Sequence, residues 1–218
     1  GRVRLEGALG TGWNGSAQLV LSGGPGSSDP ASLPSPLQWQ LRPTAGGLRL
    51  ALASDCCTPQ PMVVRVSGHW GGAAVTVANG AASQWPAALL SGLGTPWNTL
   101  QLQGDLQLAT QDLSLHWNSG RLQVSGSAQL AALRLASRVT TVRPMGSYRL
   151  RLDGGDTPRL TLETAEGPLR LAGSGQWVGA RLRFSGEASA EPEREAALSN
   201  LLNIIGRRSG ARSIITIG

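Results

Sequence analysis

Residues 100–130, LQLQGDLQLATQDLSLHWNSGRLQVSGSAQL, alternate apolar and polar side chains almost without interruption. Successive side chains of a β-strand point to opposite faces of a sheet, so this period of two predicts strands with one apolar and one polar face. The turn residues Asn118, Ser119 and Gly120 interrupt the alternation, which predicts a hairpin. The apolar positions in this stretch are Leu100, Leu102, Leu106, Leu108, Leu113, Leu115, Trp117, Leu122, Val124, Ala128 and Leu130.

The same alternation continues through most of the chain, and Gly, Asn, Asp or Pro separates most of the runs. We expect roughly a dozen strands of about five to nine residues each. Short turns join antiparallel neighbours, whereas parallel strands need long crossovers. The sequence therefore predicts an all-β, mainly antiparallel fold, either a curved meander sheet or a partly open β-barrel.

Three segments depart from the alternation. Residues 83–93 predict a short helix with Pro86 in its first turn. Residues 191–208 predict an amphipathic C-terminal helix that ends at Gly206 and covers the sheet or an open barrel end. Residues 22–36 are rich in Gly, Ser and Pro and predict a flexible loop. The apolar face of the C-terminal helix comprises Leu198, Leu201, Leu202 and Ile205.

The length of 218 residues and the apolar content of 40% suffice for one sizeable core or for two small repeats that share one. We expect a single β domain over residues 1–218. Residues 126–130 partly repeat the sequence of residues 13–19, which points to two similar halves, about 1–95 and 96–218. Chance similarity in a chain rich in Leu, Arg and Gly is the alternative.

The positive charge is carried entirely by arginine. The net charge is +6, and all 19 basic residues are Arg. Such a balance can indicate a nucleic-acid partner, but these arginines are spread singly and often alternate with leucine. A solvated strand face explains that spacing better, so we expect no nucleic-acid partner. The candidate interaction surface is Arg49, Arg65, Arg149, Arg151, Arg181 and Arg183.

The residues capable of catalysis or metal binding are sparse. His69 and His116 stand alone, the carboxylates are scattered, and the chain contains no GxSxG and no CxxC. We therefore expect no enzyme activity, no metal and no cofactor. The two cysteines, Cys56 and Cys57, are adjacent and can pair within the chain only with each other. Neighbouring Cα atoms lie ~3.8 Å apart, below the usual disulfide range, so the sequence leaves their bonding open.

Tryptophan supplies seven of the nine aromatic residues. Trp39 and Trp117 are in phase with neighbouring leucines, Trp177 lies in a strand run, and Trp13 has glycines close by. These patterns favour buried anchors, with Trp13 filling the concave face of the sheet. The alternative is an exposed aromatic platform for carbohydrate or single-stranded nucleic acid.

Four segments occur in the order GTGWNGSAQL (10–19), SPLQWQLRP (35–43), MGSYRLRL (145–152) and AEGPLRLAGSGQW (165–177). Together with the C-terminal helix, this order resembles protein N of the bacterial type II secretion system. The resemblance implies a bitopic inner-membrane protein with a short cytoplasmic start, one membrane helix and a periplasmic domain. The chain begins without Met and has no run of 18 apolar residues, so we expect the periplasmic domain, with its membrane helix removed.

The resemblance further implies a non-catalytic accessory part of the secretion machinery, with the secretin and the inner-membrane platform proteins as neighbours. We expect such a scaffold to act through polar strand faces and a free sheet edge. The alternative is a protein that binds a lipid or another hydrophobe in a β-groove. The filling of the concave face distinguishes the two, since an acyl chain needs room there.

Overall fold

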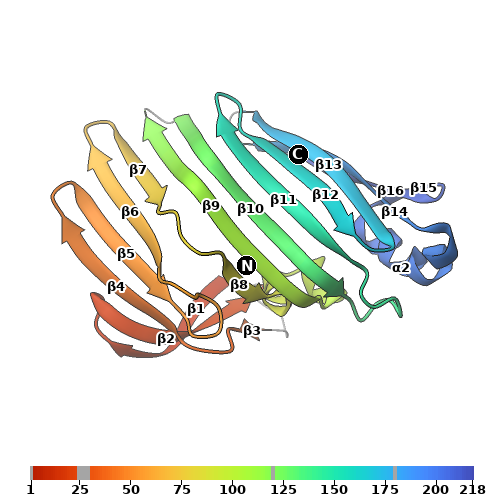
Figure 1. The fold of residues 1–218 in the computed structure, drawn as a ribbon, viewed down its shortest axis with the longest axis horizontal. Coiled ribbons are helices and arrows are strands. Elements are labelled where there is room, and N and C mark those ends of the chain that lie inside the picture. Colours follow the sequence, from red (N-terminus) through yellow and green to blue (C-terminus); the bar gives the residue numbers. More distant parts are fainter. Residues whose placement is uncertain (1, 24–29, 119–120, 179–180) are drawn as a thin grey trace.

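The protein forms one large antiparallel β-sheet. A computed structural model describes residues 2–23, 30–118, 121–178 and 181–218. In these ranges the sheet has 16 strands, in the order β1-β2-β4-β5-β6-β7-β9-β10-β11-β12-β13-β14-β16-β15, and β3 and β8 pair with β2 and β9. This path ends at β1 and β15 without closing, so the predicted open, all-β antiparallel fold is confirmed (Figure 1).

The strands before the centre of the sheet are mostly short hairpin arms. Five of these eight strands begin or end at a Gly, Asn or Pro residue. Their bounds are β1 (Arg2–Gly10), β2 (Asn14–Ser22), β3 (Ala31–Ser32), β4 (Leu37–Thr44), β5 (Gly47–Ala53), β6 (Met62–His69), β7 (Gly72–Val77) and β8 (Ser83–Pro86).

The strands from the centre onward include the two longest. Their bounds are β9 (Gln103–Asn118), β10 (Arg121–Ala136), β11 (Gly146–Gly155), β12 (Arg159–Glu166), β13 (Leu169–Val178), β14 (Arg181–Ala190), β15 (Arg207–Ser209) and β16 (Arg212–Ile217). Extra short strands such as β3, β8 and β15 raise the number in the described ranges above the roughly twelve predicted from alternation, because two to four residues are too few to show a period.

A bulge bends the long central pair β9–β10. The register shifts near Asp112, which has a φ of 49°, opposite Gly126 with a φ of 74°. Asn79 clamps this bulge, since its Nδ2 donates to Asp112 Oδ1 (2.8 Å) and its Oδ1 accepts from the Asp112 N–H (2.7 Å). Bulges increase local twist and bend a strand, which helps so many strands to form a curved sheet.

The helical predictions are partly corrected. Residues 83–86 form β8 on β9, and the 3₁₀ helix η1 (Ala87–Leu93) starts only after Pro86. A single-turn helix, α1 (Trp97–Leu100), follows and was not predicted. The C-terminal helical segment is confirmed, although shorter: η2 (Pro192–Arg194) leads into α2 (Glu195–Ile205), and the extended Gly206 then begins the turn into β15.

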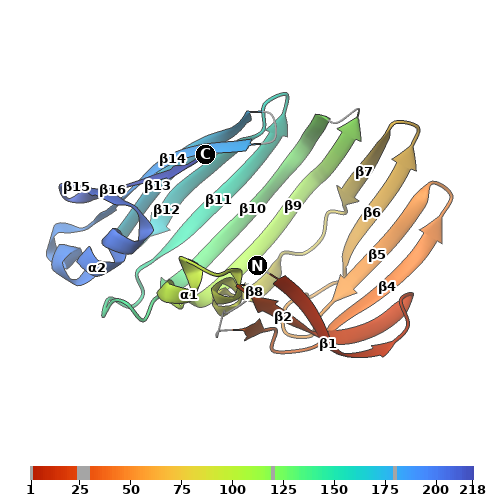
Figure 2. The same ribbon diagram turned by 180° about the vertical axis from the view of Figure 1, so that it is seen from behind.

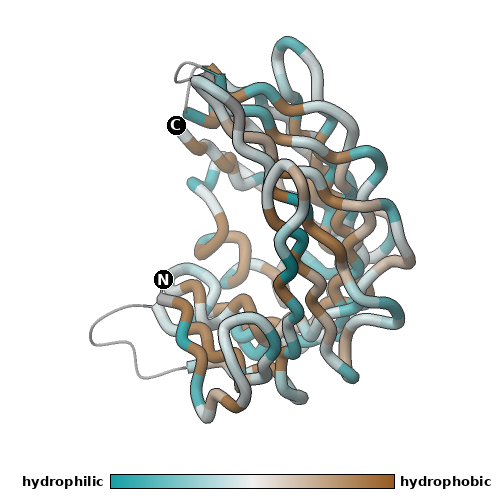
Figure 3. The backbone as a smooth tube through the Cα atoms, turned by 90° about the vertical axis from the view of Figure 1, so that its left-hand side faces the viewer, coloured by the Kyte–Doolittle hydropathy of each residue, from teal (hydrophilic) through white to brown (hydrophobic). Residues whose placement is uncertain are grey.

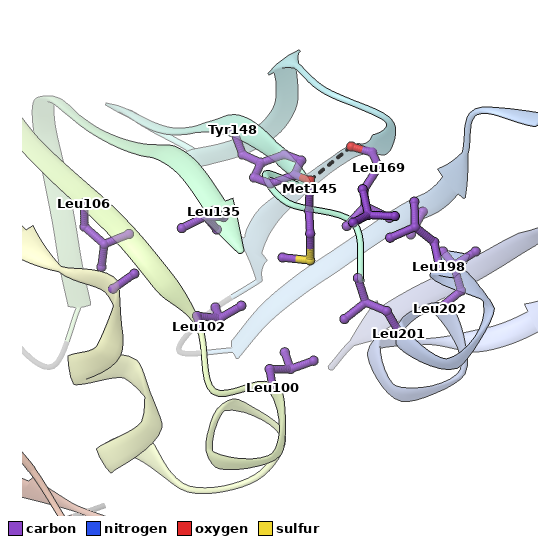
Figure 4. Packing of buried hydrophobic residues seen from close by; sticks show 13 residues of the cluster. Leu100, Leu102, Leu106, Leu135, Met145, Tyr148, Leu169, Leu198, Leu201 and Leu202 are labelled. Atoms are coloured by element: carbon purple, nitrogen blue, oxygen red, sulfur yellow. Dashed lines mark hydrogen bonds between the residues drawn. The ribbon is translucent and has the colours of Figure 1, made fainter. Parts of the chain in front are cut away.

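The core lies at one end of the sheet, on the face that carries the helical segments. We call this the inner face, because the helical segments lie inside the curve of the sheet, and the opposite side the outer face (Figures 2 and 3). Figure 4 shows Leu198, Leu201 and Leu202 of α2 near Leu169 and Met145; these three helix side chains are at most 1% exposed. The other buried members of this cluster are Ala87, Leu100, Leu102, Leu106, Leu135, Val142, Tyr148 and Ala188.

Candidate functional site

Trp39 anchors the turn between β1 and β2. Its ring is half-buried, and its Nε1–H is shared between the backbone carbonyls of Thr11 and Gly12, 3.2 Å from each. Gly15 lies directly opposite Trp39 in the β2–β4 register, and a Cβ atom there would overlap the indole. Gly15, the second residue of β2, therefore makes room for Trp39.

The predicted burial of Trp13 and Trp117 is wrong. Trp13 is 54% exposed, because it lies in the turn that Trp39 anchors. Only the backbone of Trp13 is bonded to the sheet there: its carbonyl accepts the Leu41 N–H at 2.7 Å. Trp117 lies on the inner face but is 45% exposed, since it is at the far end of β9 from the helices. Trp177 is half-buried at the corresponding end of β13.

Cys56 and Cys57 are joined by a disulfide in the turn between β5 and β6. Cys57 is 3% exposed and packs in a second, smaller core with Leu33 and Leu89. The Cys56 N–H donates to Ser35 Oγ at 2.9 Å. These contacts tie the turn to the chain before β4, so the pair has a structural environment.

The described residues offer little for acid–base chemistry. His116 Nε2 lies 2.8 Å from Ser114 Oγ, which in turn lies 3.2 Å from Thr76 Oγ1. No hydrogen bond in the described part of the chain joins a carboxylate to this histidine. Within the same ranges, no three metal-binding side chains gather closely enough to hold an ion.

Three arginines form a row across adjacent strands on the outer face. Arg42 of β4 pairs in register with Arg49 of β5, which pairs in register with Arg65 of β6. We call these three residues the arginine row. Neighbouring strands lie ~4.8 Å apart, so the row spans about 10 Å between its outer Cα atoms. Arg49 therefore has an arginine on each side. Sequence distance alone does not show this arrangement, because the strand register sets it.

The arginine row has no acidic partner among the described residues, where the ion pairs involve other arginines. Arg42 and Arg65 are exposed, and Arg49 between them is half-buried. Like charges directly opposite on antiparallel strands destabilise a sheet. The row is therefore a surface that an external anion would stabilise.

The remaining predicted arginines divide into two pairs. Arg149 and Arg151 already have carboxylate partners, because Arg149 Nη1 lies 2.6 Å from Glu163 and Arg151 Nε lies 2.8 Å from Asp153. Arg181 and Arg183 are exposed near the start of β14 and form no ion pair in the described ranges. The structure thus places the six predicted arginines on the outer face without gathering them into one site.

Among the strands that the structure describes, the sheet has two free edges. The first edge strand, β1, pairs with β2 on one side only, and its Val3 and Leu9 are 69% and 72% exposed. The other edge is the three-residue β15, which covers only the first half of β16. A nine-residue edge strand has unpaired backbone groups that another strand can use.

These features define an open, all-β protein built on one antiparallel sheet. Every helix within the described ranges falls short of the length and hydrophobicity that a membrane span requires. Residues 1–215 match the family model of type II secretion system protein N, so the chain belongs to this family and the resemblance is confirmed. The chain is therefore involved in type II secretion, with other components of that system as partners. No curated protein and no solved structure gives a significant match.

Proposed function

We propose that this protein is a non-catalytic scaffold of the type II secretion machinery and acts through protein–protein contacts in the periplasm. The observation that supports this role best is the arginine row of Arg42, Arg49 and Arg65. Arginine forms bidentate bonds to carboxylates, and it stays charged under all physiological conditions. An acidic surface on a partner, such as the secretin or an inner-membrane platform protein, would neutralise the row.

The spacing of the row fits an extended acidic segment that crosses the strands. Carboxylates at alternate positions of an extended chain lie ~6.8 Å apart, against ~4.8 Å between neighbouring arginines. Two such carboxylates can each lie between a pair of guanidinium groups within the ~10 Å row. The attraction is between charges, so we expect binding to weaken as salt is added. For the same reason, asparagine or glutamine at the same partner positions would lose most of this attraction.

The free edge of β1 offers a second contact of the same kind. Its exposed backbone groups can hydrogen-bond an added strand, while Val3, Leu5 and Leu9 supply apolar contacts on that edge. We expect the arginine row to attract and orient a partner and the edge strand to provide specific pairing.

Charge reversal tests this role. We expect Arg42→Glu, Arg49→Glu and Arg65→Glu together to abolish co-purification of the protein's secretion partners and to reduce secretion, while the melting temperature changes little, because the triple variant again places three like charges side by side. The matched control reverses Arg138, Arg143 and Arg194, which are exposed and outside the sheet strands. Both triples change the net charge equally, so normal partner binding by the first triple, or equal loss in both, would show that the row is not the contact surface.

A further inference from the structure

Part of the inner face is apolar and has no helix over it (Figure 2). The helical segments and the main core lie against one end of the sheet, and Figure 2 shows that no helix crosses the upper parts of β4, β5, β6 and β7. In this part of the face Leu48 and Val66 are each 38% exposed, and Leu122 of β10 is 42% exposed. Apolar side chains that are contiguous and exposed commonly mark a binding surface.

Two cross-strand rows make this surface continuous. In each row every residue faces its neighbour in the strand register, and no member carries a polar side chain. We call the two rows together the apolar trough. The first row is Pro43, Leu48, Val66, Val75, Leu115 and Val124, and the second is Leu41, Leu50, Val64 and Val77.

The trough has the length and chemistry for a hydrocarbon chain. Six strands at a spacing of ~4.8 Å give a row of about 24 Å. This is longer than the ~15 Å that an acyl chain spans in one leaflet of a bilayer. A peptide lying in extended form on this face would leave its inward backbone groups unsatisfied, because the side chains offer no donor or acceptor. An acyl chain has no such groups.

The rows of the trough run alongside an edge of the sheet whose residues favour a membrane interface. Trp70 lies in the β6–β7 turn and is fully exposed, and Trp117 and Trp177 lie near the ends of β9 and β13 along the same edge of the sheet in Figure 1. Tryptophan prefers the boundary between hydrocarbon and head groups. Arg159 and Arg181, which begin β12 and β14, are exposed on the outer face at this same edge and give it a positive charge that suits anionic head groups.

We infer that the apolar trough binds the acyl chain of an anionic phospholipid, which enters at the edge that carries Trp70 and Trp117. The site lies on the opposite face from the arginine row, so it is independent of the proposed scaffold role. Both can operate in one molecule, with a lipid on the inner face and a partner on the outer face.

The test is photo-crosslinking of the intact chain with vesicles that contain phosphatidylglycerol with a diazirine in its acyl chain. We expect crosslinks to map to the strand segments that contain Leu48, Val66 and Leu115. The double variant Leu48→Glu, Val66→Glu should lose about tenfold of the crosslinked product. The matched control Arg49→Glu, Arg65→Glu changes the opposite face of the same two strands and should retain acyl crosslinking, or lose only the part that depends on vesicle charge.

If the double variant does not fold, the map of crosslinks in the unchanged protein still tests the inference. Crosslinks confined to the Trp70 turn would overturn the inference, because they would indicate bilayer contact without an acyl chain in the trough. Crosslinks on the outer face, or none, would also overturn it. A third outcome would also overturn the inference: acyl crosslinking is lost when a second copy of the chain, or a partner with an amphipathic helix, is added and covers Leu48 and Val66.

Discussion

Tyr148→Phe should reverse its effect on stability as the pH rises. Tyr148 is the only tyrosine in the chain; it is 5% exposed in the main core, and its hydroxyl donates to the Leu169 carbonyl at 3.1 Å (Figure 4). Burial raises the pKa of this phenol well above its ordinary value, and the nearby Arg170 offsets only part of that rise. The folded protein therefore keeps the phenolic proton at a pH where the unfolded chain releases it.

The magnitude follows from linkage between proton binding and folding. At about pH 8 the hydrogen bond should make the natural protein more stable than the Phe variant by ~1 kcal/mol. Above the unfolded pKa of ~10, the free energy of unfolding falls by ~1.4 kcal/mol per pH unit in the natural protein only. The loss reaches ~1 kcal/mol near pH 10.7 and ~2 kcal/mol near pH 11.5, so the Phe variant should be the more stable protein beyond about pH 10.7.

Urea unfolding followed by tryptophan fluorescence measures this at several pH values in both proteins. The comparison is clean because the chain has no lysine, both cysteines are bonded in the structure, and arginine titrates only above about pH 12. Ultraviolet absorbance of tyrosinate in the folded protein gives an independent reading. A native absorbance midpoint near pH 10, or parallel loss of stability in both proteins, would refute the burial argument.

Two further stability predictions concern packing. Leu202→Ala should lower the free energy of unfolding by about 2–5 kcal/mol because Leu202 is fully buried, while the exposed Asn203→Ala next to it should change it by less than about 0.5 kcal/mol; equal effects in urea denaturation would contradict the position of α2 on the sheet. Gly15→Ala should cost about 1–3 kcal/mol, since its Cβ would overlap Trp39 and approach the Leu9 carbonyl to 2.7 Å. Gly12→Ala in the same turn meets nothing within 4 Å and serves as the control.

The sequence predicted the architecture well because alternation is a local property. Each hairpin places its own apolar residues on one face, and short turns then force antiparallel neighbours. The β9–β10 pair shows this: the alternation quoted from residues 100–130 gave the inner-face residues of both strands, which meet in register as Leu108 with Leu130 and Trp117 with Leu122. The family resemblance also followed from ordered local motifs.

Burial was less predictable because it depends on what covers a face. Trp39 and Trp117 have the same alternating context, yet one is held over Gly15 and the other is 45% exposed. The difference arises from non-local positions: a turn closes against Trp39, whereas the helical segments lie at the other end of β9 from Trp117. An apolar period therefore assigns a side chain to a face, and only the tertiary structure decides whether that face is core.

The same distinction separates a charged surface from a site. Arg49, Arg65, Arg149 and Arg151 all alternate with apolar residues, and sequence alone treats them alike. Register places Arg49 between two other arginines but places Arg149 opposite Glu163. One guanidinium group is thus repelled by its neighbours and the other is neutralised, which makes charge reversal at Arg49 a test of partner binding and charge reversal at Arg149 mainly a test of the sheet. Strand pairing, rather than composition, therefore decides which of the described arginines lie beside like charges and which lie beside a carboxylate.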